Sequence, residues 1–192
     1  MVRRERSILI LFENLLLLRM RQIVSNEARV ILGVDPGFVS AGFGVIRLFE
    51  KRAELLESGV LAQSSQTTIP ARIERFHDFM AEKITTYSVT DLALETPFLG
   101  KNAQNFLKLG YLRGVLLLLG QRQGLIIHEF SPREIKLLIT GSGRAEKEQV
   151  ARVLLRLFPS LMMPRKLDAT DAVAVALCGL WQLQQKFSLA AR

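Results

Sequence analysis

The sequence predicts a single α/β domain in which a five-stranded mixed sheet is flanked by helices. Three extended segments joined by short connections come first, which favours antiparallel pairing between neighbours. Helical and extended segments then alternate, and this order adds strands that can run parallel to the first. The 192 residues are 49% hydrophobic and 23% charged, which suits one domain with a sizeable core.

The first three predicted strands surround an acidic turn. Residues 30–34 form an apolar run broken only by one glycine, which is typical of a strand covered on both faces. Asp35 ends this run, and a Pro-Gly turn leads to a second strand at residues 42–46 and a third at 54–62. A carboxylate in this position is costly to desolvate without a positive partner, although Asp35 could instead hydrogen-bond its own turn.

The rest of the chain alternates helices with two short strands. The strands are predicted at residues 91–95, which again end in an acid, and at 125–130. Residues 96–101 are predicted to be a loop, because their proline and glycine interrupt either regular pattern. Helices are predicted over residues 68–84, 102–121, 131–140, 146–158 and 167–185. The signals are capping residues, prolines in first turns and apolar positions at helical spacing.

The charge balance favours a polyanionic partner. Lys and Arg number 26 against 18 Asp and Glu, which gives a net charge of +8 and a pI near 10.1. A merely basic soluble protein is the alternative. The single cysteine excludes an internal disulfide, and with only two histidines a structural zinc site is disfavoured.

Residues 1–27 differ from the rest of the chain and are interpreted as an N-terminal extension. Their apolar part is short and interrupted, and no small-residue cleavage site follows it, so neither a membrane span nor a secretory signal is predicted. We expect a cytoplasmic protein with its domain at residues 28–187 and a tail at 188–192. One hypothesis is that the natural start is Met20; an N-terminus at Met1 or Val2, found by mass spectrometry of the native protein, would contradict it.

Two pairs of acids are expected to converge. If the fourth strand pairs in parallel with the first, Asp35 and Glu95 lie on the same edge of the sheet, where neighbouring strands are about 4.8 Å apart. Asp168 and Asp171 are three residues apart, so they share one face near the positive N-terminal end of the last helix. Taken alone, acids in a first helical turn are ordinary.

Four clustered carboxylates would require a cation. Two like charges about 4 Å apart repel by roughly 4 kcal/mol at an effective dielectric constant of 20. Oxygen ligands without Cys or His fit Mg²⁺ or Mn²⁺, which bind through few carboxylates together with phosphate oxygens. An acidic metal site in a basic protein is suited to hydrolysing a phosphodiester, because basic residues can hold the nucleic-acid backbone.

Four segments carry a resemblance to a known family. In order they read GVDPGFVSAGFGVI, ALETPFLGKNAQNFLKLGYLRGV, SPREIKLLITGSGRAEKEQV and DATDAVAVAL. Together they resemble the RuvC family of bacterial Holliday-junction resolvases, which has an RNase H-like fold, and the similarity runs from about residue 30 to 181. It implies a nuclease that cuts two opposing strands symmetrically at a four-way DNA junction, with Mg²⁺ as cofactor and Mn²⁺ as a substitute.

The resemblance also assigns residues. It implies a metal-binding catalytic quartet of Asp35, Glu95, Asp168 and Asp171; some relatives carry histidine at the third of these positions. Phe98 matches an aromatic residue implicated in stacking on unpaired junction bases, with burial in the core as the alternative. Lys136 and Lys147 match basic positions linked to the active site and the DNA backbone. Lys101, Lys108, Arg133 and Arg144 are candidates for further phosphate contacts. The alternative is that each is an ordinary charge on the protein surface. The family normally begins almost at the first strand, so the N-terminal extension puts the start of the chain in doubt.

A nearly two-fold symmetric junction implies a homodimer. The expected interface is the helix at residues 103–121, where Leu112, Val115, Leu116 and Leu119 form one stripe and other faces are apolar too. Burial of this helix inside one monomer is the alternative. A branch-migration motor is a further expected partner.

The resolvase function has three rivals. An actin-like or sugar-kinase-type ATPase needs two lobes and a second Gly-rich phosphate hairpin, and this chain is too short for the former and lacks the latter. A catalytically inactive junction-binding protein is disfavoured because all four acids are present. A nuclease of the same fold that acts on RNA/DNA hybrids or transposon ends is the main alternative.

Overall fold

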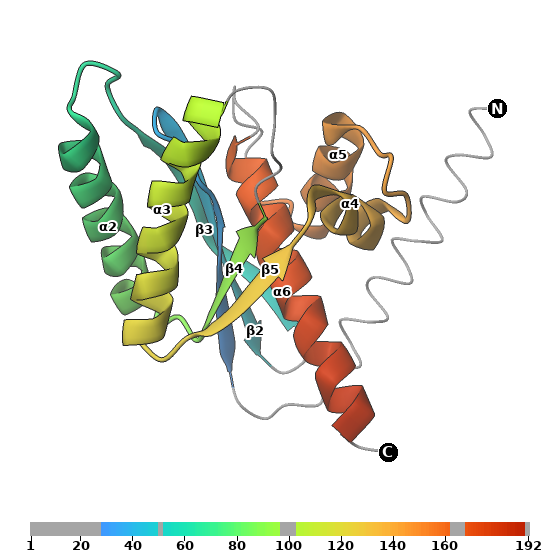
Figure 1. Ribbon diagram of the computed structural model, residues 1–192. Helices are drawn as coiled ribbons and strands as arrows, with labels where there is room; N and C mark the ends of the chain where they lie inside the picture. The colour runs from blue at the N-terminus through green and yellow to red at the C-terminus, as the bar shows by residue number, and fades with distance from the viewer. Residues whose placement is uncertain (1–27, 50–51, 97–102, 162–167, 191–192) are drawn as a thin grey trace.

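A computed structural model describes residues 28–49, 52–96, 103–161 and 168–190, with side chains up to Gln182. Its centre is one five-stranded sheet with the strand order β3-β2-β1-β4-β5 (Figure 1). β1 pairs antiparallel with β2 and parallel with β4, so the predicted mixed sheet is confirmed. The strands are β1 (Arg29–Asp35), β2 (Ser40–Phe49), β3 (Arg52–Ala62), β4 (Asp91–Glu95) and β5 (Ile126–Phe130).

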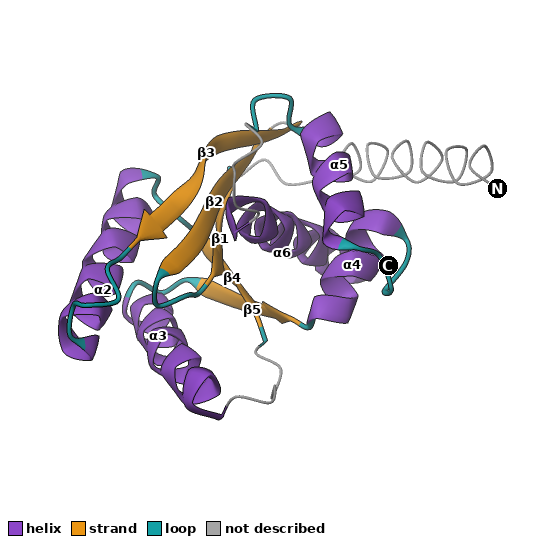
Figure 2. Ribbon diagram, turned by 90° about the horizontal axis from the view of Figure 1, so that it is seen from above, coloured by secondary structure: helices purple, strands orange, loops and turns teal. Residues whose placement is uncertain are grey.

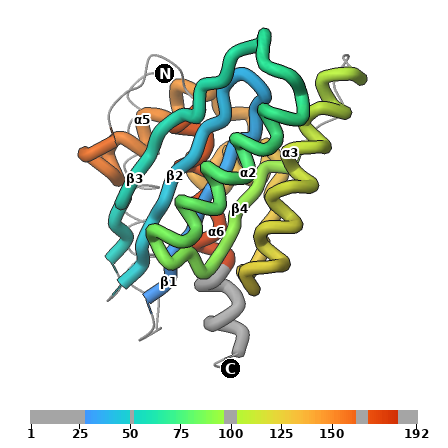
Figure 3. Tube along the Cα trace, turned by 90° about the vertical axis from the view of Figure 1, so that its left-hand side faces the viewer, coloured from blue at the N-terminus to red at the C-terminus, as the bar shows by residue number. Residues whose placement is uncertain are grey.

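Helices cover both faces of the sheet (Figures 2 and 3). One layer contains α2 (Ile69–Thr86) and α3 (Ala103–Arg122). The other contains α4 (Pro132–Thr140), α5 (Lys147–Leu157) and α6 (Asp168–Ala190). Two hydrophobic cores result, one on each side of the sheet. Of the helices that the structure describes, none combines the length and the apolar character needed to cross a membrane.

Local sequence signals explain where the helices begin and end. Ser131 starts α4 with a capping box, in which its side chain and that of Glu134 each bond the other's backbone N–H. Gly141 ends the same helix in the left-handed conformation, at φ 77°. α6 extends five residues beyond its predicted end at Gln185, because no glycine or proline interrupts the sequence there. The predicted cap Asn102 and most of the predicted 96–101 loop lie outside the described residues.

The alternation of side chains in the strands determines which residues face α6. In β1, Leu32 and Val34 enter the core under α2 and α3, whereas Ile31 enters the core under α6. Because successive strand residues point to opposite faces, Asp35 shares the α6 side with Ile31. In β4, Ala93 belongs to the α6 core, which puts Glu95 on that side as well.

Candidate active site

The two acids at the strand ends lie on the same edge of the sheet. β1 and β4 pair in parallel, with Val34 opposite Leu94, so Asp35 and Glu95 follow on adjacent strands. The parallel pairing expected from the sequence is therefore confirmed. We call the four residues Asp35, Glu95, Asp168 and Asp171 the acidic edge.

Glycines in the sheet let α6 bring its two acids to this edge. A Cβ atom at Gly33 would overlap the backbone oxygen of Ala172, and one at Gly42 would overlap the backbone oxygen of Asp168. The helix backbone therefore lies directly on β1 and β2, which a larger residue at either position would prevent. Asp168 and Asp171 occupy the first turn of α6, where that turn meets the ends of the strands.

Burial and neighbouring negative charges raise the pKa values of the two acids at the strand ends. Burial raises the pKa of Asp35 to about 7, and the negative charges of the other three acids add to the effect. Burial and the charge of Asp171 also raise the pKa of Glu95. Lys147 opposes both shifts, and Lys136 opposes that of Glu95. Such raised values are expected for buried carboxylates that lie near other negative charges.

Two of the acids have partners within the chain. Lys147 Nζ lies 2.6 Å from Asp171 Oδ2, and the Ser40 hydroxyl donates a hydrogen bond to Asp168 Oδ2. Within the described side chains, no three Asp, Glu, His or Cys residues lie so that they could hold one ion together. The donor chemistry still fits Mg²⁺, which is commonly held by one or two carboxylates together with phosphate oxygens of the substrate.

Comparison with known proteins identifies the family. The family profile described as Crossover junction endodeoxyribonuclease RuvC matches residues 31–179. The chain belongs to the RuvC family. The RuvC of Pelodictyon phaeoclathratiforme is 40% identical over 151 residues, 79% of each chain. That of Bacteroides fragilis is 38% identical over 159 residues, 82% of this chain and 85% of the relative. Nucleases of this family depend on divalent metal ions.

Solved resolvase structures share the fold. The structure of T. thermophilus RuvC in complex with Holliday junction substrate matches with a TM-score of 0.76 and 26% identity, over 82% of this chain and 96% of that one. The yeast mitochondrial Holliday junction resolvase Ydc2 matches with a TM-score of 0.62 over 91% of this chain and 87% of that one. Its 13% identity bears on the fold alone. The predicted RNase H-like fold class is confirmed.

The basic residues expected from the RuvC resemblance fall into two groups. Lys136 in α4 and Lys147 at the start of α5 act electrostatically on the acidic edge. Arg133 lies in α4 and packs its side chain against Gly143, in the exposed turn that also holds Arg144. Lys108 lies in α3, in the helix layer on the opposite face of the sheet from α6. Phe98 and Lys101 lie outside the described residues.

Sequence reasoning missed two residues that support the acidic edge. Arg113 in α3 donates a hydrogen bond from Nη1 to the backbone oxygen of Glu95, at 3.1 Å, and its Nη2 pairs with Glu129 on β5. Ser40 contacts Asp168 across 128 residues of sequence. Neither contact has a local signal, because each joins segments that only the sheet brings together.

The predicted dimer stripe is wrong in its residues. Leu112, Leu116 and Leu119 are buried in the core of the monomer, because this side of α3 packs on the sheet. Val115, the remaining member, is partly buried in the same core. The opposite side of α3 carries a second apolar stripe at helical spacing, in which Leu107, Tyr111 and Leu118 are 56%, 41% and 51% exposed.

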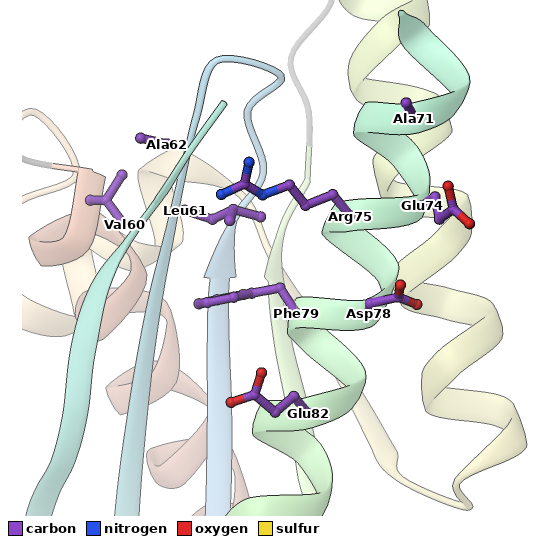
Figure 4. Close-up of a pocket in the computed structure, with 9 residues that line it drawn as sticks. All are labelled: Val60, Leu61, Ala62, Ala71, Glu74, Arg75, Asp78, Phe79 and Glu82. Atoms are coloured by element: carbon purple, nitrogen blue, oxygen red, sulfur yellow. The ribbon is translucent and has the colours of Figure 1, made fainter. Parts of the chain in front are cut away.

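A separate groove between β3 and α2 has a different character. Its volume is about 660 Å³, and Arg75 and Phe79 point from α2 toward β3 across it, whereas Glu74 and Asp78 point away (Figure 4). Glu82 also lines this groove. Three acids beside one arginine make a poor surface for DNA phosphates, so we do not count this groove as part of the active site.

Proposed function

We propose that this protein is a structure-specific endonuclease that resolves four-way DNA junctions by hydrolysing one phosphodiester bond in each of two opposing strands. The observation that supports the proposal is the placement of Asp35 and Glu95 at the ends of adjacent strands, where burial and then the neighbouring negative charges raise the pKa of Asp35 to about 7. Membership of the RuvC family supports the substrate class. A solved relative with this fold is in complex with Holliday junction substrate.

The acids would hold Mg²⁺, or Mn²⁺ in its place. Asp35 and Glu95 are the central ligands in this proposal, because both lie at the ends of neighbouring strands and both have raised pKa values. Asp168 and Asp171 would complete the site from the first turn of α6. When bound, the metal activates a water molecule and stabilises the leaving oxygen of the phosphodiester.

Basic residues beside the acids would hold the DNA backbone. Lys147 has a side chain that is 62% exposed, so its ammonium group can contact both Asp171 and an incoming phosphate. Lys136 would act next to it, and Arg133 and Arg144 would extend the contact along the turn between α4 and α5. Stacking of Phe98 on junction bases and phosphate contacts of Lys101 and Lys108 remain predictions. So does a branch-migration motor as a partner.

A homodimer would supply two cutting sites related by a two-fold axis. The exposed stripe of α3 is the proposed interface, because Gly110 and Gly114, which have open space around them, would let a second copy of this helix approach closely. Sedimentation of the wild type should give a dimer, and Leu118→Glu should give a monomer. Leu137→Glu, an equally exposed leucine on α4, is the matched control that should leave the dimer intact. A monomeric wild type, or a dimeric Leu118→Glu, would contradict this interface.

The deciding assay offers the protein a synthetic mobile four-way junction with Mg²⁺. We expect paired, symmetric nicks that ligase can seal, and binding that weakens steeply as salt rises. Linear duplex and an RNA/DNA hybrid of the same length serve as control substrates and should remain intact. Equal cutting of the hybrid would favour a nuclease with another substrate, and junction binding without cutting would favour an inactive binding protein.

A further inference from the structure

Ser40, the first residue of β2, connects two separate parts of the acidic edge. Its hydroxyl donates a hydrogen bond to Oδ2 of Asp168. The bond therefore joins the hairpin that follows Asp35 to the helix that supplies two of the four acids. We propose that Ser40 is a positioning residue that fixes the Asp168 carboxylate for metal binding. This inference rests on the proposed function, because it assigns Ser40 a part in the same site.

The packing of β2 against α6 explains why a serine reaches this carboxylate. Residues two apart in a strand share a face, so Ser40, Gly42 and Gly44 all point toward α6. A Cβ atom at Gly42 would overlap the backbone oxygen of Asp168, and one at Gly44 would press on Val173. The bare backbone at these two positions brings the first turn of α6 down onto β2. The short side chain of Ser40 then spans the remaining gap.

A hydroxyl group is a suitable hydrogen-bond partner for a carboxylate that binds a metal ion. A carboxylate accepts through two oxygens, and Ser40 engages only Oδ2 of Asp168. The other oxygen keeps its orientation and stays available to a cation. A neutral hydroxyl leaves the negative charge of the carboxylate in place, in contrast to the ammonium group of Lys147 beside Asp171. Partners that orient metal ligands in this way commonly change metal affinity by 10- to 100-fold when removed.

The test measures Mn²⁺ binding directly, from the electron paramagnetic resonance signal of free Mn²⁺, in the full-length protein without DNA. Ser40→Ala should bind Mn²⁺ about tenfold more weakly than the wild type. Ser40→Thr keeps the hydroxyl and should restore most of the affinity. Ser58→Ala makes the same change on β3, opposite Gly44, and should bind Mn²⁺ as the wild type does. Thermal unfolding midpoints of all four proteins report any loss of folding.

Junction assays separate this inference from the proposed function. We expect Ser40→Ala to need more Mg²⁺ for half-maximal cutting and to bind the junction normally in EDTA, which a general loss of structure would not produce. If the wild type cuts junctions but Ser40→Ala binds Mn²⁺ equally well, the positioning role is wrong and the nuclease function stands. A Ser40→Thr variant as weak as Ser40→Ala would also overturn the role of the hydroxyl. If Ser40→Ala weakens Mn²⁺ binding but the wild type never cuts junctions, the proposed function is wrong and the role of Ser40 stands.

Discussion

The two ends of β4 carry acids with opposite electrostatics. At the amino end, Asp91 is fully buried and accepts hydrogen bonds from Arg29, at 2.8 and 3.0 Å, and from His128 Nε2, at 2.9 Å. Burial alone would raise the pKa of Asp91, but its hydrogen bonds together outweigh that effect, so the pKa lies below its ordinary value. At the carboxyl end, burial and neighbouring negative charge raise the pKa of Glu95.

The difference separates an acid that stabilises the fold from one that we propose as a metal ligand in the same strand. Asp91 has its charge neutralised by the chain itself, so it contributes to the fold and needs nothing further. Burial, and after it the neighbouring carboxylates, raise the pKa values of Glu95 and Asp35, and a cation at this edge would stabilise their charged forms.

The largest expected effect is on cutting. Asp35→Asn keeps the shape of the side chain and removes the charge, so it should lower the rate of junction cutting by about a thousandfold, since a metal ion stabilises the transition state by several kcal/mol. Junction affinity should stay close to that of the wild type. Single-turnover assays on a four-way junction measure the rate, and Asp91→Asn, assayed as folded protein, should cut within about threefold of the wild type. If both variants lost the same cutting rate, the distinction between Asp35 and Asp91 would be wrong.

The next effect is on the free energy of unfolding, which should depend on Asp91 and not on the acids of the acidic edge. Asp91→Asn removes the charge that pairs with Arg29 and should lower the free energy of unfolding by about 3 kcal/mol. Glu95→Gln removes one of several like charges and should leave the free energy of unfolding in EDTA unchanged or raised. Urea unfolding followed by circular dichroism gives both values. Destabilisation of Glu95→Gln as large as that of Asp91→Asn would mean that Glu95 is structural too.

The pH dependence of stability should follow the raised pKa of Asp35. The unfolded chain releases this proton near pH 4, whereas the folded, metal-free protein keeps it until about pH 7. Stability from this group is therefore fully present below about pH 4 and is lost as the pH rises through 7, by roughly 4 kcal/mol in all and roughly 3 kcal/mol between pH 5 and 8. Urea unfolding in EDTA between pH 5 and 8 measures the slope. The slope should be shallower in Asp35→Asn, and an unchanged slope would assign it to another group.

The smallest expected effect concerns Lys147, the cation at the start of α5 that pairs with Asp171. Lys147→Gln removes a positive charge that lowers the pKa values of Asp35 and Glu95, so the acid limb of the pH–rate profile should move to higher pH. Cutting at pH 7 should fall by about tenfold, the equivalent of about one pKa unit. Lys83→Gln breaks a similar pair with Glu57 between α2 and β3, and should leave the profile unchanged.

Local patterns in the sequence were sufficient to predict the strands and the acids at their ends. The apolar runs before Asp35 and Glu95 identify buried strands, and parallel pairing then brings the two residues to one edge. The buried side of α3 could not be predicted, because both the 112–119 stripe and the 107–118 stripe are apolar and only packing distinguishes them.

Long-range polar contacts were beyond sequence reasoning. The bond from His128 to Asp91 crosses 37 residues, and Arg29 reaches the same carboxylate across 62. No periodicity or motif reports such partners. The same limit hid Ser40 and Arg113, whose roles beside the acidic edge depend on which strands become neighbours.

A crystal structure of crystals soaked in Mn²⁺, with the ion located by its anomalous scattering, tests directly whether Asp35 and Glu95 bind a metal ion. We expect Mn²⁺ within coordination distance of the Asp35 and Glu95 carboxylates, at the carboxyl ends of β1 and β4. Mn²⁺ bound only elsewhere, for example by Glu74 and Asp78 along α2, would contradict it.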